Sequence, residues 1–238
     1  MRILKTTFHD MRFQLKHGFY FIYAVIVVFY IVLVGILPAS WSNTATVIIL
    51  FIDPAALGFF FIGGILLLEK RERVLDALFV SPLHVWEYII AKTLSLGFIS
   101  VLTGVIVAVI GLGANVNILV LIISLMAGSL LYTFVGLAAG VRAKTVNQYM
   151  IITVPAEIVL SVPPFLLLFG VKSTLLEIMP GSLVFRLLQW CTGEYSAASP
   201  AVLLAGVLLW IVPAFLLAID RTNWFLSRIG GEAYEADN

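Results

Sequence analysis

The sequence EKRERVLDALFVSPLHVWEYIIAK, residues 69–92, interrupts a chain that is otherwise largely apolar. It opens with five consecutive charged residues, 69–73, which are too costly to place in hydrocarbon. An amphipathic run follows, whose apolar side chains fall on one helical face. These side chains are Val74, Leu75, Leu78 and Phe79. The stretch therefore predicts a helical loop that lies outside the lipid.

In the second half of this loop, one predicted helix ends and another begins. Pro82 has no N–H donor and disfavours the helical conformation of Ser81, so the first helix should end there. We expect a second short helix, from His84 to Lys92, to lead back to the membrane.

The composition places the rest of the chain in a bilayer. Of the 238 residues, 62% are hydrophobic and 11% are charged, and the mean hydropathy is +1.11. Soluble domains contain about 45–50% apolar residues. A membrane-spanning helix needs about 20 apolar residues, so the length allows about six spans. The sequence predicts an all-α membrane protein with six transmembrane helices and no separate soluble domain.

The apolar runs give these spans their limits. We expect a six-helix transmembrane domain over residues 19–219, in which Asp53–Pro54 interrupts the second span, and Pro155 and Pro163–Pro164 break the fifth. Glycines within the spans should let helix backbones approach closely in lipid. The expected spans are about Phe19–Leu37, Thr44–Leu68, Thr93–Leu112, Ile118–Val141, Tyr149–Gly170 and Ala201–Ile219.

Three segments lie outside these spans. Residues 1–18 mix basic and apolar side chains, as an amphipathic helix on an anionic membrane surface would; a solvated positive tail is the alternative. Residues 171–199 are too short and too polar to cross the bilayer and are expected to form interfacial or re-entrant helices. Residues 220–238 form a polar tail, partly disordered at its end.

The basic residues set the orientation. With the N-terminus inside, 12 of the 14 Lys and Arg residues fall on the cytoplasmic side, and Lys172 and Arg186 are the two exceptions. The positive-inside rule therefore places both termini and residues 69–92 in the cytoplasm.

Enzymatic motifs are missing from the sequence. No G-x-x-x-x-G-K-[ST] motif occurs, so this chain has no P-loop to hold a nucleotide. The histidines His9, His17 and His84 have no second ligand at metal-binding spacing. We expect neither a catalytic site nor a metal or cofactor in this chain.

Two acids lie within predicted spans. Asp53 is in the second span and Glu157 in the fifth. A carboxylate at such depth is costly, so it normally faces a water-filled path or a partner. Both residues are candidates for a substrate pathway. The alternative is that each carboxylate bonds backbone groups near the adjacent proline, Pro54 or Pro155.

The loop resembles the first cytoplasmic loop of ABC-2 type transporter permeases, and the six-span layout supports the resemblance. The departure from that family is Arg73–Val74, where Gly-Thr is common. Among these permeases the chain is most similar to prokaryotic exporters of fluoroquinolones and other drugs. The matching residues are Glu69, Glu72, Leu78, Ser81, Pro82, Leu83, Tyr88, Ala91 and Lys92.

The resemblance implies an ABC-2, type V exporter-like architecture with an N-terminal elbow helix, in a prokaryotic plasma membrane. It implies two permease subunits, identical or paralogous, and two ATP-binding subunits that carry the ATP and Mg. Residues 69–92 would be the coupling helix that docks on the ATPase. The expected coupling residues are Glu69, Glu72, Arg73, Leu75, Leu78, Phe79, Ser81 and Pro82.

A drug, a lipid or a peptide would fit apolar walls equally well, so the substrate is expected to be amphipathic and moved outward. The main alternative is a secondary transporter that couples export to protons through Glu157 and Asp53. A third is a membrane scaffold, in which these acids would matter only for stability.

Overall fold

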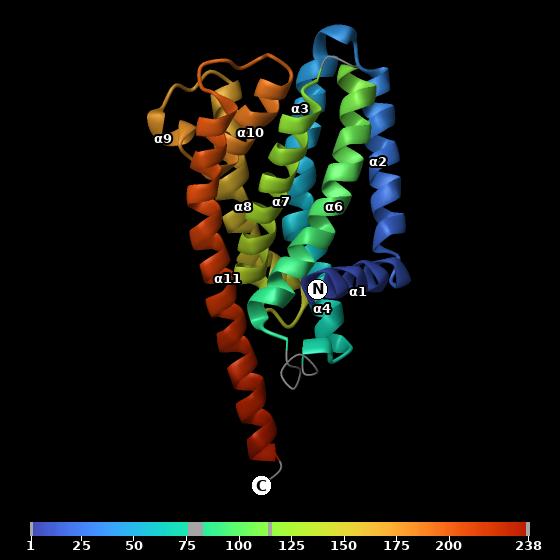
Figure 1. The fold of residues 1–238 in the computed structure, drawn as a ribbon, viewed down its shortest axis with the longest axis vertical. Helices are drawn as coiled ribbons and strands as arrows, with labels where there is room; N and C mark the ends of the chain where they lie inside the picture. The colour runs from blue at the N-terminus through green and yellow to red at the C-terminus, as the bar shows by residue number, and fades with distance from the viewer. Residues whose placement is uncertain (1, 76–82, 114–115, 237–238) are drawn as a thin grey trace.

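The chain folds into a helical bundle (Figure 1). The computed structural model describes residues 2–75, 83–113 and 116–236, and these contain helices and no strand. The expected all-α class is thus confirmed. The helices are α1 (Arg2–Lys16), α2 (Phe19–Ile36), α3 (Ala39–Ala56), the π-helical turn η1 (Leu57–Phe61), α4 (Ile62–Arg71), α6 (Val85–Leu112), α7 (Ile118–Gly140), α8 (Val146–Leu168), α9 (Thr174–Glu177), α10 (Pro180–Cys191) and α11 (Pro200–Ala236).

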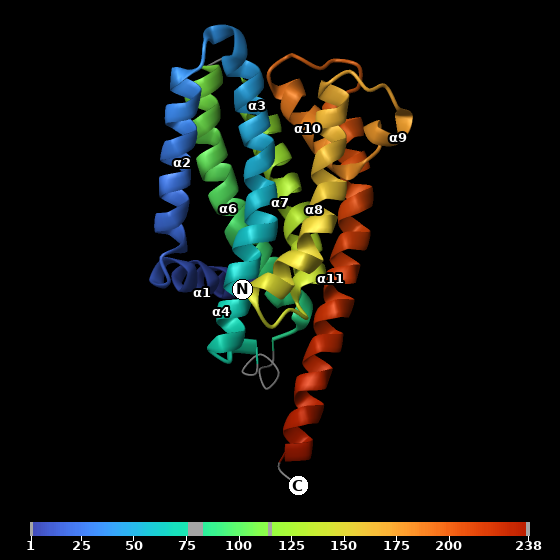
Figure 2. The same ribbon diagram turned by 180° about the vertical axis from the view of Figure 1, so that it is seen from behind.

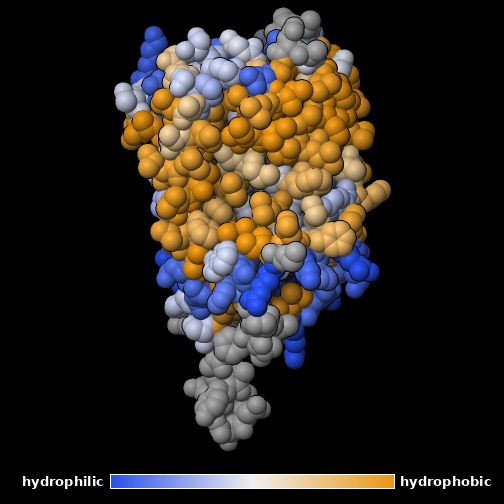
Figure 3. Space-filling model, in the orientation of Figure 1, coloured by the Kyte–Doolittle hydropathy of each residue, from blue (hydrophilic) through white to orange (hydrophobic). Residues whose placement is uncertain are grey.

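Six of the described segments are long and apolar enough to cross a bilayer, which confirms the predicted number of spans. On the face shown in Figure 3, apolar side chains form a broad band across the middle of the bundle, and hydrophilic ones lie toward its ends. This is a multi-pass membrane protein. The six segments are Phe19–Ile36, Trp41–Arg71, Val85–Leu112, Ile118–Gly140, Val146–Leu168 and Pro200–Ser227.

Several helices are longer or less interrupted than expected. Residues 85–92 are the first turns of α6 and not a separate helix. Helix α8 continues through its three prolines. Helix α11 runs on to Ala236, beyond the expected span and into the tail that was expected to be partly disordered (Figure 1). Local sequence composition places a helix end where polarity rises, but a rise in polarity alone does not end a helix.

Helix α7 is the centre of the bundle. It contacts α3, η1, α4, α6, α8, α10 and α11. Within its most apolar 18-residue stretch 56% of the residues are buried, against 17% for α2 and 22% for α8. Helices α2 and α8 therefore present much of their apolar surface to lipid or to another chain.

The expected interruption at Pro54 is a change of helical pitch and not a break. Pro54 lies inside α3 and cannot donate to the preceding turn, and the π-helical turn η1 begins three residues later. Here the chain approaches α7 most closely: a Cβ on Gly136 would lie 1.9 Å from the carbonyl oxygen of Gly58. Such turns are found frequently at functional sites.

Tyr149 locks the start of α8 against this turn. Its hydroxyl donates to the carbonyl of Phe59 at 2.6 Å. A Cβ on Gly63 or Gly140 would collide with its ring, at 2.3 Å and 1.9 Å. Glycines on two helices thus make the slot that a buried aromatic ring fills, as expected for helix packing in lipid.

The two ends of the bundle differ. Helix α1 lies across one end of the bundle, and the start of α6, the end of α4 and the C-terminal part of α11 lie at the same end (Figures 1 and 2). Helices α9 and α10 lie at the opposite end. Of these two, α10 is well buried and packs on α7, α8 and α11.

We predict that Gly136→Ala destabilises the protein by about 1–3 kcal/mol, because the added methyl group must displace the backbone of Gly58. Gly35→Ala on α2 is the matched control, since its Cβ would meet no atom within 4 Å. Thermal unfolding in detergent measures both. Equal melting temperatures for the two variants would contradict the close approach of η1 and α7.

Candidate functional site

The described flanks of the 69–92 loop lie at the end of the bundle that carries α1. Helix α4 ends at Arg71, and Arg73 then takes a φ of 56°, a left-handed conformation that is uncommon for residues with a Cβ. The chain enters α6 at His84, whose N–H donates to the Glu87 carboxylate at 2.9 Å. Four of the expected coupling residues, Leu78, Phe79, Ser81 and Pro82, lie outside the described residues.

A buried ion network joins these flanks to α1. The Lys92 ammonium donates to Glu69 Oε1 on α4 and to Asp10 Oδ1 on α1, each at 2.7 Å. The relative exposure of the three residues is 1% for Lys92, 4% for Glu69 and 9% for Asp10. One cation on α6 therefore binds carboxylates on two other helices, in the middle of α1 and near the end of α4.

Neutral donors complete the network. Tyr88 donates to Glu69 Oε2 at 2.6 Å. Gln14 donates to Asp10 Oδ2 at 2.7 Å, and Ser95 donates to the same oxygen. The two carboxylates and one ammonium leave a formal charge of −1, which these dipoles help to stabilise. Buried charges survive only when they are paired and hydrogen-bonded in this way.

Two of the expected coupling residues, Glu69 and Leu75, lie inside the chain. Glu69 was expected to meet charges on a partner protein, but its carboxylate faces Lys92 and Tyr88 inside the chain. Leu75 was expected on a docking face, but it is 1% exposed. Glu72 and Arg73 do lie at the surface, and Glu72 contacts Nε2 of His17 at 2.8 Å.

The sequence does not pair Asp10 or Lys92 with any residue. It does indicate that Lys92 needs a partner, because Lys92 lies two turns inside an apolar helix. Its partners are 82 and 23 residues away in sequence, so spacing could not identify them.

A second set of basic residues ties α4 and α11 to the connector between α7 and α8. The Lys70 ammonium donates to the carbonyls of Val141 and Ala143, the latter at 2.7 Å. It also lies 4.3 Å from the ring centre of Phe225 on α11. The Arg142 guanidinium stacks 3.6 Å from the ring centre of Trp224. The flanks of the loop are thus held on two sides.

Asp53 is sealed in the bundle. Its carboxylate accepts hydrogen bonds from Tyr23 on α2 and from Ser100 on α6, the latter at 3.2 Å. Its exposure is 3%. Both hydrogen bonds to this carboxylate come from side chains on other helices and not from backbone near Pro54.

Glu157 has a different environment. It is partly exposed on α8, and within the described residues its carboxylate forms neither a hydrogen bond nor an ion pair. The alternative of bonding to backbone beside Pro155 is therefore not observed. An unpaired carboxylate on a membrane span is expected to face water, a ligand or another chain.

We predict that Lys92→Met lowers the free energy of unfolding by about 3–5 kcal/mol, because it leaves two buried carboxylates without a cation. Lys144→Met, at an exposed position, should have little effect. Adding Asp10→Asn and Glu69→Gln to Lys92→Met should restore part of the loss. Thermal unfolding measures all three, and no rescue in the triple variant would argue against charge as the cause.

Comparison with known proteins identifies the family of the chain. Residues 1–226 match the model of the fluoroquinolones export permease protein family. Two relatives, the fluoroquinolones export permease proteins of Mycobacterium tuberculosis strains CDC 1551/Oshkosh and H37Rv, are each 32% identical over 182 residues. The matches cover 72% of this chain and 76% of each relative. The resemblance drawn from the sequence is confirmed at this level: the chain belongs to the fluoroquinolones export permease protein family.

Proposed function

We propose that this chain is the membrane subunit of an ATP-driven exporter of the ABC-2 type. Two permease subunits would assemble with two ATP-binding subunits, which would hold the ATP and Mg. The end with α1 and the flanks of the loop would face the cytoplasm of a prokaryotic cell, together with both termini. The concentration of basic residues at this end supports that orientation.

The observation that carries the proposal is the contact of Lys92 with both Asp10 and Glu69. It joins the two ends of the 69–92 loop to the N-terminal helix, so we expect these three parts to move together. A push on the loop would then reach the second and third spans and α1 together. A surface loop with no mechanical role would not need three buried charges at its base.

The docking surface would combine described and undescribed parts of the loop. Glu72 and Arg73 are exposed beside it and could meet charges on the ATPase. Leu78, Phe79, Ser81 and Pro82 retain their predicted role as the docking segment. Glu69 and Leu75 would support the loop from inside and not touch the partner.

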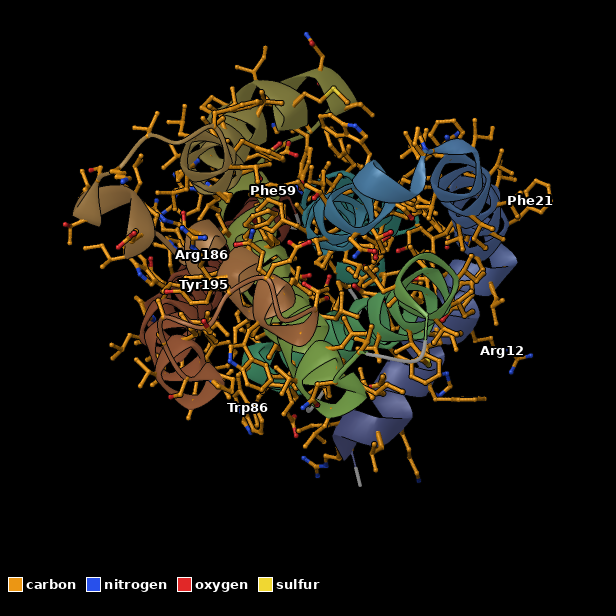
Figure 4. The ribbon with its side chains drawn as sticks, turned by 90° about the horizontal axis from the view of Figure 1, so that it is seen from above. Arg12, Phe21, Phe59, Trp86, Arg186 and Tyr195 are labelled. Carbon is orange, nitrogen blue, oxygen red and sulfur yellow. The ribbon has the colours of Figure 1, made fainter. Side chains whose placement is uncertain are left out.

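The substrate route would lie between permease copies. Helices α2 and α8 are the least buried of the six spans. Phe21 on α2 is 75% exposed and points away from the bundle (Figure 4). A second copy covering this region would enclose Glu157, whose carboxylate could then meet substrate. The relatives' names make an amphipathic drug such as a fluoroquinolone the first substrate to test.

A proton-coupled transporter is the second candidate. The free carboxylate of Glu157 is the observation that favours it. Asp53 is a poor second proton carrier, because it is buried and already accepts two hydrogen bonds.

The partner is tested first. We predict that the ATP-binding protein encoded nearest to this gene co-purifies with the chain, and that Leu78→Asp separates or uncouples them because it buries an unpaired carboxylate. Leu175→Asp is the control, since Leu175 is 62% exposed at the opposite end. ATPase activity and co-purification are the measurements. Unchanged ATPase activity and binding in Leu78→Asp would contradict the docking role.

The driving force is tested with Glu157→Gln and Asp53→Asn. We predict that Glu157→Gln lowers ATP-driven uptake of a fluoroquinolone into inverted vesicles and leaves the melting temperature unchanged. Asp53→Asn should instead lower stability by about 1 kcal/mol, through a weakened hydrogen bond. Uptake driven by a proton gradient without ATP, and lost in Glu157→Gln, would favour the second candidate.

A further inference from the structure

The end of the bundle opposite α1 contains a polar cavity of about 400 Å³. Its walls come from the end of α8, from α9 and from α10. The polar and charged side chains among them are Lys172, Ser173, Thr174, Glu177 and Arg186. Lys172 and Arg186 are the only Lys or Arg residues between positions 145 and 220, and both line this one cavity.

The guanidinium of Arg186 is held in place. Its Nη1 donates to the side-chain oxygen of Gln189 at 3.0 Å, and Gln189 is 8% exposed. The ring of Tyr195 lies against it, 4.7 Å from ring centre to Cζ (Figure 4). Neither contact neutralises the charge, and among the described residues the guanidinium makes no hydrogen bond besides that to Gln189. A guanidinium fixed in this way is suited to binding an oxyanion.

The cavity has a net positive charge. Lys172 and Arg186 contribute two positive charges and Glu177 one negative charge, and no ion pair joins them in the part of the chain that the structure describes. Positive sites that lack an internal partner attract anions, and phosphate groups are among the anions that Arg and Lys bind.

An apolar cavity of about 620 Å³ lies deeper in the same side of the bundle. It is formed by α7, α8, α10 and α11, and Val159, Leu160, Trp210 and Pro213 are among its walls. Leu160 lines this cavity and Leu167 lines the polar one. These leucines are seven residues apart on one face of α8, which corresponds to about 10 Å along the helix axis.

Trp210 lines the apolar cavity and also contacts the segment that borders the polar cavity. Its indole N–H donates to the carbonyl of Ile178 at 3.1 Å, next to Glu177 of the polar cavity. An acyl chain fits an apolar cavity at membrane depth, and a phosphate fits the cationic cavity above it. A free phosphate would use only the polar cavity, and an uncharged hydrocarbon only the apolar one.

We propose that the two cavities together bind one anionic phospholipid. Its phosphate contacts Lys172 and Arg186, and one acyl chain lies in the cavity between α8 and α11. In the orientation proposed above this lipid comes from the outer leaflet. The site does not depend on the ATP-binding partner, so it can be tested on the permease chain alone.

The experiment measures lipid binding to the detergent-purified full chain by native mass spectrometry and by melting temperature. The probes are phosphatidylglycerol, phosphatidylcholine with the same acyl chains, and inorganic phosphate. Phosphatidylglycerol should bind more tightly than phosphatidylcholine and raise the melting temperature more. Inorganic phosphate should do neither at comparable concentration. Equal binding of the two lipids, or a shift with phosphate that matches the lipid, would overturn the proposal.

Single substitutions test which residues bind the phosphate of phosphatidylglycerol. Arg186→Gln should weaken phosphatidylglycerol binding by roughly tenfold, the scale of a lost charge-assisted hydrogen bond. Arg186→Lys should keep part of the binding. Glu177→Gln should strengthen it by removing the negative charge. Arg12→Gln removes a charge from the surface of α1 and is the matched control. Equal losses in Arg12→Gln and Arg186→Gln, or weaker binding in Glu177→Gln, would contradict the assigned site.

The apolar half is tested separately. Val159 is 59% exposed at the edge of the cavity, so Val159→Trp should fill the cavity without disturbing the core. It should weaken the binding of both phospholipids several-fold, because it excludes the acyl chain. Val202→Trp, at a 64% exposed position outside the cavity lining, is the control. Unchanged binding in Val159→Trp would show that the acyl chain lies elsewhere.

Discussion

The ammonium of Lys92 lies between two carboxylates from different helices, and the arrangement of one whole end of the bundle depends on it. Without it, Asp10 and Glu69 would be buried anions, and α1 and α4 would separate from α6 to hydrate them. The network therefore does more than stabilise the fold: it also joins three helices. Because both carboxylates depend on the one ammonium of Lys92, the positions of the three helices are interdependent.

This interdependence explains why the loop could act as a lever. A single surface helix yields to a push by bending at its ends. Here Glu69 opens the 69–92 loop and Lys92 closes it, and they are bonded to each other. In the second anchor Lys70, next to Glu69 in sequence, and Arg142 meet the aromatic rings of α11. A displacement of the loop would be shared among spans and not absorbed locally.

The sequence predicted the membrane class and the six spans, because these depend on local composition. It did not predict the network, because Asp10 and Lys92 are 82 residues apart and no local pattern pairs them. For the same reason it did not indicate that the carboxylate of Glu69 faces Lys92 inside the chain. The helix breaks predicted at the prolines have a different explanation. Pro54 and Pro155 do remove backbone donors, but the structure accommodates each of them within a continuous helical path.

The distribution of charge also separates the two ends by function. At the end with α1 the buried charges satisfy one another, so they are structural and leave only exposed residues such as Glu72 and Arg73 for a partner. At the opposite end Arg186 is oriented by Gln189 and Tyr195 but not neutralised. A guanidinium that is oriented but not paired with an acid can still bind an oxyanion. The same residue types thus build the frame at one end and a site for a ligand at the other.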